Sequence, residues 1–160
     1  MIVRIALNAD LDQMVDLWME LMEHHAPLHR LFELHPNARR IARHELAYRM
    51  RAPEARFFVC ETDSGKLAGM IATHYYASSP TNVYYQRGYI AETVVGRAYR
   101  GQGIGERLVS VARQWLTALG VDYIELQVSP ANERGLAFWK GQGFEELTYH
   151  LTYDVHSEEE

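Results

Sequence analysis

The chain has 160 residues, of which 48% are hydrophobic and 23% charged, and its formal net charge at pH 7 is −5. This length suits one domain with a full hydrophobic core, so we expect a single domain over residues 1–155 and a disordered tail over residues 156–160. No apolar run approaches the roughly 18 residues of a membrane span, and the acidic charge balance argues against nucleic acid as a partner.

The N-terminal residues and the cysteine content favour a cytoplasmic protein. Residues 1–5 pass directly into an alternating strand pattern, without the pattern of a signal peptide. Cys60 is the only cysteine, so it has no partner for an internal disulfide or a cysteine metal site. It lies in a strand-like apolar run, and we assign it no chemical role.

The first part of the chain predicts a strand followed by a helix. Residues 3–5 alternate between apolar and charged side chains, as in a strand. Asp10 with Gln13 forms a capping-box pattern, and apolar residues recur at helical spacing after it, so a helix is predicted over residues 10–23.

A second helix is predicted over residues 37–51, with Ile41 and Tyr48 on its packing side and Arg39, Arg40 and Arg43 in solvent. Prolines interrupt the segment between the two helices. Five histidines fall between residues 24 and 44: His24, His25, His29, His35 and His44. None shows the His-Glu-x-x-His arrangement and no acidic ligand is fixed beside them, so we predict no metal site.

The second half of the chain predicts strands and helices in alternation. In chain order we expect a hairpin of strands 57–60 and 67–76, a strand 89–95, a helix 104–119, a strand 121–128 and a short helix 133–140. A final strand is predicted over residues 147–155, where Tyr149, Leu151 and Tyr153 alternate with polar residues. This pattern favours an edge strand or the seam of a homodimer.

A glycine-rich turn lies between the strand over residues 89–95 and the helix that follows it. Three glycines alternate within it, so several backbone N–H groups can converge on one anion at a helix start, where the helix dipole adds positive charge. The turn consists of Arg100, Gly101, Gln102, Gly103, Ile104 and Gly105. The glycines alone do not choose among a dinucleotide, ATP and CoA.

Two familiar nucleotide loops fit this turn poorly. A dinucleotide loop requires Gly-x-Gly-x-x-Gly after a first strand and an acidic residue about 20 residues later, whereas this turn comes late in the chain. A Walker loop requires Gly-Lys-Ser or Gly-Lys-Thr, which is not present here.

Two motifs at compatible spacing resemble those of the GNAT N-acetyltransferase superfamily. Its phosphate loop matches at Arg100, Gly103 and Gly105. Its later motif, an asparagine followed by a short helix and Gly-Phe, matches from Asn132 to residues 143–144. The expected strand lies between the two motifs, which makes the match specific.

The resemblance covers residues 57–155 and implies an α/β fold, with a mixed, mostly antiparallel sheet and helices on both of its faces. It implies that the sheet is splayed between the strands ending at Val95 and near Val128, and that the pantetheine arm of acetyl-CoA fills the splay. The implied cofactor contacts are main-chain bonds from Val94 and Val95, a pyrophosphate site at residues 100–105, and contacts from Asn132 and Trp139.

The implied activity is transfer of an acetyl group from acetyl-CoA to a primary amine of a small molecule or peptide, directly in a ternary complex. Proteins of this superfamily are often homodimers. A function of another class stays open, namely a non-catalytic sensor or interaction module that binds acyl-CoA.

Glu92 is the candidate for the base that accepts the amine proton. It lies three residues before Val95 on the strand expected to line the cofactor. Strand alternation places Glu92 and Val94 on the same face of the strand. For Glu92 to accept the proton while Val94 contacts the cofactor, the strand needs a bulge or the site needs an open polar cleft.

The acid that protonates the leaving thiolate has no clear candidate. Trp139 stands where many GNAT proteins carry a tyrosine, and an indole N–H is no useful proton source. Ser129 and Tyr149 are the remaining candidates besides water. Ser129 also fits a turn before a proline, and Asn132 also fits a helix cap.

Overall fold

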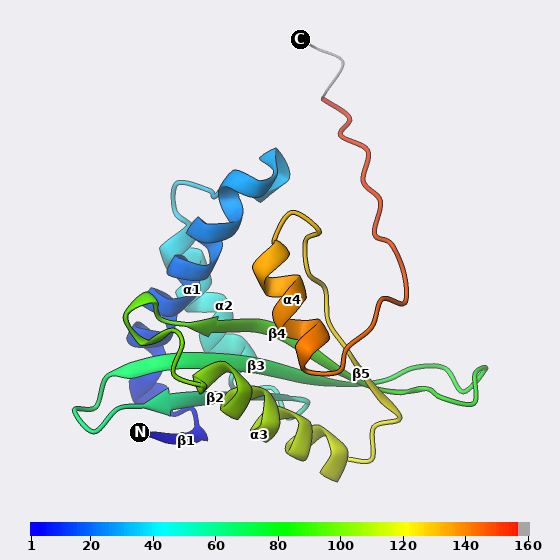
Figure 1. The fold of residues 1–160 in the computed structure, drawn as a ribbon, viewed down its shortest axis with the longest axis horizontal. Coiled ribbons are helices and arrows are strands. Elements are labelled where there is room, and N and C mark those ends of the chain that lie inside the picture. The colour runs from blue at the N-terminus through cyan, green and yellow to red at the C-terminus, as the bar shows by residue number, and fades with distance from the viewer. Residues whose placement is uncertain (157–160) are drawn as a thin grey trace.

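The computed structural model describes residues 1–156, so most of the predicted tail lies outside the described residues. At its centre is a five-stranded sheet in the order β1-β2-β3-β4-β5 (Figure 1). Neighbouring strands are antiparallel except β4 and β5, which are parallel. The strands are β1 (Ile2–Ile5), β2 (Ala55–Glu61), β3 (Leu67–Ala77), β4 (Gln86–Val95) and β5 (Tyr123–Glu125). The predicted mixed, mostly antiparallel sheet is confirmed.

Helices cover both faces of the sheet, as predicted. The long helices are α1 (Leu11–His25), α2 (Ala38–Arg49), α3 (Ile104–Ala118) and α4 (Glu133–Gly141). Helices α1 and α2 share one core with Met70 of β3, whereas α3 and α4 share the other with Ile71. Successive strand side chains point to opposite faces of the sheet. Met70 and Ile71 are both fully buried because helices cover each of these faces. Within residues 1–156, no helix combines the length and apolar character needed to cross a membrane.

The predicted packing side of α2 is wrong. The helix buries Ala38, Ala42 and Leu46, while Ile41 is 38% and Tyr48 72% exposed. Two small alanines let the α2 backbone approach its neighbours closely, which a stripe of larger residues would prevent.

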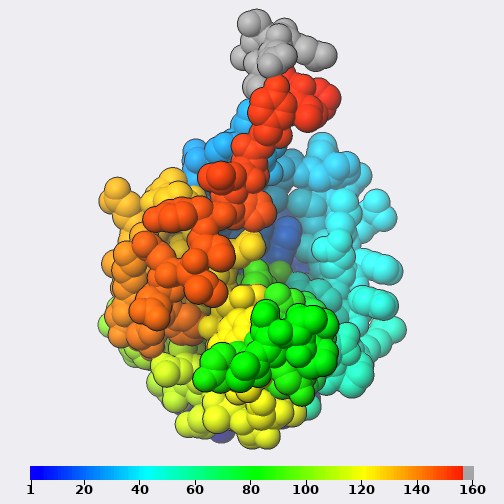
Figure 2. All heavy atoms as spheres, turned by 90° about the vertical axis from the view of Figure 1, so that its right-hand side faces the viewer, coloured from blue at the N-terminus to red at the C-terminus, as the bar shows by residue number. Residues whose placement is uncertain are grey.

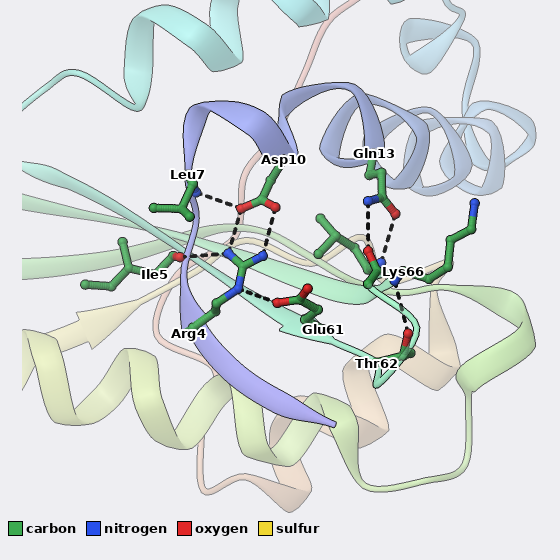
Figure 3. A network of polar contacts seen from close by, with 10 residues as sticks. Arg4, Ile5, Leu7, Asp10, Gln13, Glu61, Thr62 and Lys66 are labelled. Atoms are coloured by element: carbon green, nitrogen blue, oxygen red, sulfur yellow. Dashed lines mark hydrogen bonds and ion pairs between the residues drawn. The ribbon is translucent and has the colours of Figure 1, made fainter.

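A network of charged side chains joins β1 to the start of α1 (Figure 3). The Arg4 guanidinium donates to both carboxylate oxygens of Asp10, at 2.7 and 2.9 Å, and to Glu61 on β2 at 2.6 Å. Asp10 also accepts the Leu7 N–H, at 2.7 Å. Because Asp10 turns toward Arg4 and Gln13 toward the β2–β3 turn, the predicted capping box is wrong.

We expect Asp10→Asn to lower the free energy of unfolding by about 2 kcal/mol, since it weakens charged hydrogen bonds to a carboxylate that is only 8% exposed. The Arg4 hydrogen bonds hold the pKa of Asp10 below its ordinary value of 3.8, against the opposing effect of burial. The wild-type stabilisation is therefore present above pH 3.8 and is lost as the pH falls below it. Urea unfolding at several pH values measures both effects.

Asp12→Asn is the matched control for this prediction. Asp12 also lies in the first turn of α1 and pairs with Arg43 at 2.9 Å, but its side chain is 81% exposed. Exposed pairs of this kind contribute about 0–1 kcal/mol. An equal loss of stability in the two variants would contradict a special role of the Arg4–Asp10 pair.

The strand predicted over residues 147–155 is wrong for the single chain. Residues 144–154 follow α4 as an extended segment that forms no strand with the sheet of its own chain. The segment bends away from the sheet and so lacks the ladder of hydrogen bonds that defines a strand (Figure 1).

Candidate functional site

The sheet opens between its two parallel strands. Strand β5 pairs with β4 only at Arg87, Gly88 and Tyr89, and within the described residues the edge of β4 from Ile90 to Val95 has no neighbour on that side. Strand β5 is accordingly shorter than the predicted 121–128. The predicted splay is therefore present, and it leaves main-chain groups of β4 facing an opening.

A bulge in β4 lies beside this opening. Ile71 of β3 pairs with Thr93, and Thr73 pairs with Ile90, so two steps along β3 oppose three along β4. The extra residue changes the facing of the strand: Ile90 packs with α3, whereas Val94 packs with α1 and α2. The bulge separates the facing of Ile90 from that of Val94, while Glu92 points toward α2, on the side where Val94 packs.

Glu92 forms an ion pair with Arg49 of α2. The guanidinium donates to both carboxylate oxygens at 2.7 Å, and the side chains are 25% and 14% exposed for Arg49 and Glu92. Burial by itself would raise the pKa of Glu92, but the hydrogen bonds and charge of Arg49 outweigh it and lower the pKa. Glu92 is therefore a firmly ionised carboxylate.

His74 extends the same cluster from β3. Its Nε2 lies 2.9 Å from Arg49 Nη2, and since a guanidinium can only donate, the imidazole nitrogen accepts. Burial, followed by the charge of Arg49, lowers the pKa of His74, so the ring is neutral at pH 7. The lone pair of His74 Nε2 accepts the hydrogen bond from Arg49 in this arrangement. The ring therefore positions Arg49 and is poorly suited to accept a proton at this nitrogen.

Aromatic rings continue from this cluster along β3 and β4. His74 stacks on Tyr76 with 6.0 Å between ring centroids, and Tyr76 meets the edge of Tyr89 at 6.5 Å. Arg87 lies over Tyr76, 4.9 Å from its centroid, and pairs with Glu125 of β5 at 3.0 Å. The edge of the opening nearest to β5 is thus lined by aromatic and charged side chains.

Thr93 contributes an unpaired hydroxyl to β4. Its Oγ1 is buried and has no hydrogen-bond partner within residues 1–156. Buried polar groups are nearly always paired in folded proteins, so an orphaned hydroxyl beside an open strand edge suits a polar ligand. Arg49, His74 and Thr93 were missed from sequence, because no motif links α2 and β3 to one position on β4.

The glycine turn connects the end of β4 to the start of α3. Gly101 and Gly103 have φ values of +75° and +71°, in the left-handed region that favours glycine. The first N–H bonded back within α3 is that of Arg107, so the preceding N–H groups of the turn have no backbone partner among residues 1–156 and can bind an anion. Arg100 is held against the turn by Val95 O at 3.2 Å and Glu20 of α1 at 3.3 Å.

Gly105 serves helix packing. A Cβ at this position would lie 3.2 Å from the ring of Phe138, tighter than most real contacts. Its missing side chain therefore lets α3 approach α4. The third glycine of the motif thus has a packing reason that does not involve an anion.

The second motif mainly builds the start and the packing of α4. Asn132 Oδ1 accepts the Gly135 N–H at 3.0 Å, so its helix-cap interpretation is confirmed. Trp139 packs edge-on against Phe138 and Phe144, with centroids 5.1 and 5.3 Å apart.

The two acid candidates differ in their surroundings. Ser129 Oγ accepts the Ala131 N–H at 3.3 Å, as expected of a turn residue. Tyr149 lies on the segment after α4, and its side chain is 85% exposed. No contact within residues 1–156 holds either side chain as a proton donor.

Three of the five histidines between residues 24 and 44 make local backbone contacts. His29 and His35 each accept a backbone N–H two residues further on, and His25 contacts the carbonyl of Leu21. Across residues 1–156, no group of three or more His, Cys, Asp or Glu side chains is arranged to hold a metal ion.

The comparisons with known proteins agree with this architecture. The chain matches the Acetyltransferase (GNAT) family over residues 12–144. It is 29% identical over 146 residues to an uncharacterised N-acetyltransferase of Methanocaldococcus jannaschii. This alignment covers 90% of the present chain but only about 60% of the length of that relative.

Two solved structures share the fold. A tetramutant of a Bacillus halodurans protein superposes with a TM-score of 0.87 at 21% identity, over 97% of this chain and 100% of the other. An aminoglycoside N-acetyltransferase in complex with CoA superposes with a TM-score of 0.74 at 16% identity, over 96% of this chain and 98% of the other. These similarities show that the chain has an α/β fold shared with acetyltransferase structures. The chain belongs to the acetyltransferase (GNAT) family, as its two motifs indicated.

Proposed function

We propose that this protein is an N-acetyltransferase that transfers the acetyl group of acetyl-CoA to a primary amine in the cytoplasm. The observation that carries the proposal is the opening between β4 and β5 directly beside the glycine turn. An elongated cofactor with amides at one end and phosphates at the other suits a site with free strand edges at one end and free helix N–H groups at the other.

In this proposal the pantetheine arm pairs with the main chain of Val94 and Val95, and the pyrophosphate binds at residues 100–105. The unpaired Thr93 hydroxyl supplies a further polar contact inside the opening. Trp139 and Asn132 support the site by fixing α4 beside it.

The acceptor binds on the side of Glu92. Its ionised carboxylate and the neighbouring aromatic rings attract an ammonium group. The amine must lose a proton before its nitrogen attacks the thioester carbon, and Glu92 receives that proton directly or through water. Glu92 exchanges part of its contact with Arg49 for the incoming ammonium.

Transfer is direct, within a ternary complex of protein, acetyl-CoA and amine. Cys60 is the only cysteine of the chain and is fully buried in β2, so it is unsuited to carry the acetyl group. The tetrahedral intermediate collapses with release of the CoA thiolate. The attacking nitrogen gives up its second proton as the amide forms, and water carries this proton to the thiolate, because neither Ser129 nor Tyr149 is held as an acid by contacts within residues 1–156.

A screen of amines with a free-thiol readout tests the proposal. Polyamines, aminoglycosides and peptides with a free N-terminus are incubated with the protein and acetyl-CoA, and the release of CoA is followed. We expect amine-dependent release accompanied by a mass increase of one acetyl group on the acceptor. Binding of acetyl-CoA without turnover on any amine would instead support the alternative, a non-catalytic acyl-CoA sensor.

A further inference from the structure

A second carboxylate–arginine pair lies on the acceptor side of the opening. Glu125 of β5 contacts Arg87 of β4 with 3.0 Å between nitrogen and oxygen, and the Arg87 and Glu125 side chains are 34% and 32% exposed. The first pair is tighter and more buried, because Arg49 donates to both oxygens of Glu92 at 2.7 Å. A partly exposed, loosely paired carboxylate can exchange its partner for a cationic ligand at little cost. Glu125 is therefore the more accessible of the two carboxylates.

Tyr89 lies between these two carboxylates. Its Cα pairs in register with that of Glu125, and Glu92 follows three residues later on β4. Three residues of a strand span about 10 Å, so the two carboxylates are attached to the sheet at this separation. Burial, followed by the charges of Glu125 and Glu92, raises the pKa of Tyr89, so its hydroxyl keeps its proton at pH 7. A neutral ring thus separates two negative charges.

Aromatic rings line the space between the carboxylates. Tyr76 meets the edge of Tyr89 and is 39% exposed. Arg87 already lies over the Tyr76 ring, which shows that this ring accepts a cation. Figure 2 looks onto this side of the molecule and shows it hollowed between α2, in cyan, and the orange to red part of the chain, above the green turn between β3 and β4. An apolar chain with cationic ends suits such a surface.

The charges around this space have an excess of negative sign. Besides the two pairs, Glu45 acts electrostatically on Arg49, and Glu54 acts on His74. Since His74 is neutral, these contacts bring together four carboxylates and two guanidiniums among the described residues. A monoamine neutralises only half of the excess, a dication neutralises all of it, and a carboxylate on the acceptor adds to it.

We propose that the acceptor is a linear diamine or polyamine, whose reacting amine binds at Glu92 and whose second ammonium binds at Glu125. The methylene chain between the two nitrogens lies on the rings of Tyr76 and Tyr89. Glu125 exchanges part of its contact with Arg87 for the second ammonium and thereby selects the acceptor. This selectivity rests on the proposed acetyl transfer to an amine and adds the class of amine that the site prefers.

Three acceptors with chains of equal carbon number test the second subsite. Hexamethylenediamine, hexylamine and ε-aminocaproate end in an ammonium, a methyl group and a carboxylate, respectively. We expect kcat/KM for the diamine to exceed that for the monoamine about 10-fold, the effect of one charge-assisted hydrogen bond, and the amino acid to be the poorest acceptor. Ethylenediamine, which is too short to reach both carboxylates, gains nothing over ethylamine.

Two substitutions break the Arg87–Glu125 pair from opposite sides. Glu125→Gln removes the carboxylate, so the preference for hexamethylenediamine over hexylamine falls about 10-fold. Arg87→Met removes the competing guanidinium and leaves Glu125 to the ligand, so the preference rises. A merely structural pair would shift the preference in the same direction in both variants, because either change breaks the same contact.

Asp16→Asn is the matched control. It removes the same charge from an exposed pair with Arg39, at 2.7 Å, and keeps the preference for the diamine. Circular dichroism verifies that every variant is folded.

Binding distinguishes the second subsite from the proposed enzymatic function. Isothermal titration of hexamethylenediamine and hexylamine into the protein with CoA measures the subsite without turnover. Selective binding of the diamine without acetyl transfer to any amine would keep the subsite and remove the enzymatic function. Equal kcat/KM for the diamine and the monoamine would keep the enzymatic function and overturn the subsite. Equal binding of both amines without transfer, or shifts of the same sign in Glu125→Gln and Arg87→Met, would also overturn it.

Discussion

Gly103→Trp is expected to weaken CoA binding at least about 100-fold. The substitution places a large side chain at the start of α3, over the N–H groups proposed to hold the pyrophosphate, and forces it into a φ of +71°. Loss of two hydrogen bonds to a charged group, at about 1.5 kcal/mol each, corresponds to about 3 kcal/mol and hence to a factor of about 100. Isothermal titration with CoA measures the change.

Gly120→Trp provides the control for this substitution. Gly120 has a similar φ of +78°, lies just beyond the opposite end of α3, and has open space around the position of an added Cβ. The two variants therefore carry a similar backbone strain and differ mainly in which end of the helix they cover. An unchanged CoA affinity in Gly103→Trp, or an equal loss of CoA affinity in Gly120→Trp, would show that the glycine turn does not bind the pyrophosphate.

Glu92→Gln is expected to lower kcat at least about 100-fold, the usual size of the contribution from a positioned general base. Glutamine keeps the shape of the side chain but cannot accept the amine proton. The measurement is steady-state kinetics on an acceptor identified by the amine screen. Activity within a factor of about three of the wild type would exclude Glu92 as the base.

A change at Arg49 separates the base role from a structural one. In wild type, Arg49 holds the pKa of Glu92 low against the effect of burial. Arg49→Met removes the two largest influences that lower the pKa of Glu92, so this pKa rises and the acidic limb of the kcat/KM profile moves to higher pH. A limb that stays in place would show that Glu92 does not control the reaction.

The same pair of residues contributes to folding, which the experiment must separate from chemistry. Removal of one partner from a mostly buried ion pair leaves a charge unpaired and costs about 3–5 kcal/mol. The double variant Arg49→Met/Glu92→Gln removes both charges together. We expect it to regain most of the lost stability while remaining inactive, as unfolding in urea and kinetics will show.

Local patterns carried much of the fold. The periods of apolar residues predicted all four long helices and the strands of the antiparallel part of the sheet, since amphipathic spacing directly reflects which faces are buried. The glycine turn and the Asn132 cap were also predictable, because a left-handed backbone and a helix start each require particular residues at particular positions. These two motifs were enough to indicate the family.

Contacts between distant segments could not be predicted in this way. The pairing of Arg49 with Glu92 joins residues 43 positions apart, and only the packing of α2 against the bulged β4 brings them together. Asp10 likewise does not cap α1 as predicted, because its carboxylate forms stronger, charge-assisted hydrogen bonds with Arg4.

By itself, the sequence determined the family, the order of the elements and the position of the glycine turn, since each of these depends on residues close together in the chain. Only the tertiary structure decided that β5 is short, that Glu92 is ion-paired and that the last predicted strand does not join the sheet. The physical reason is that a strand pattern specifies which side of a segment will be buried, whereas the partner that buries it is set by the packing of the whole molecule.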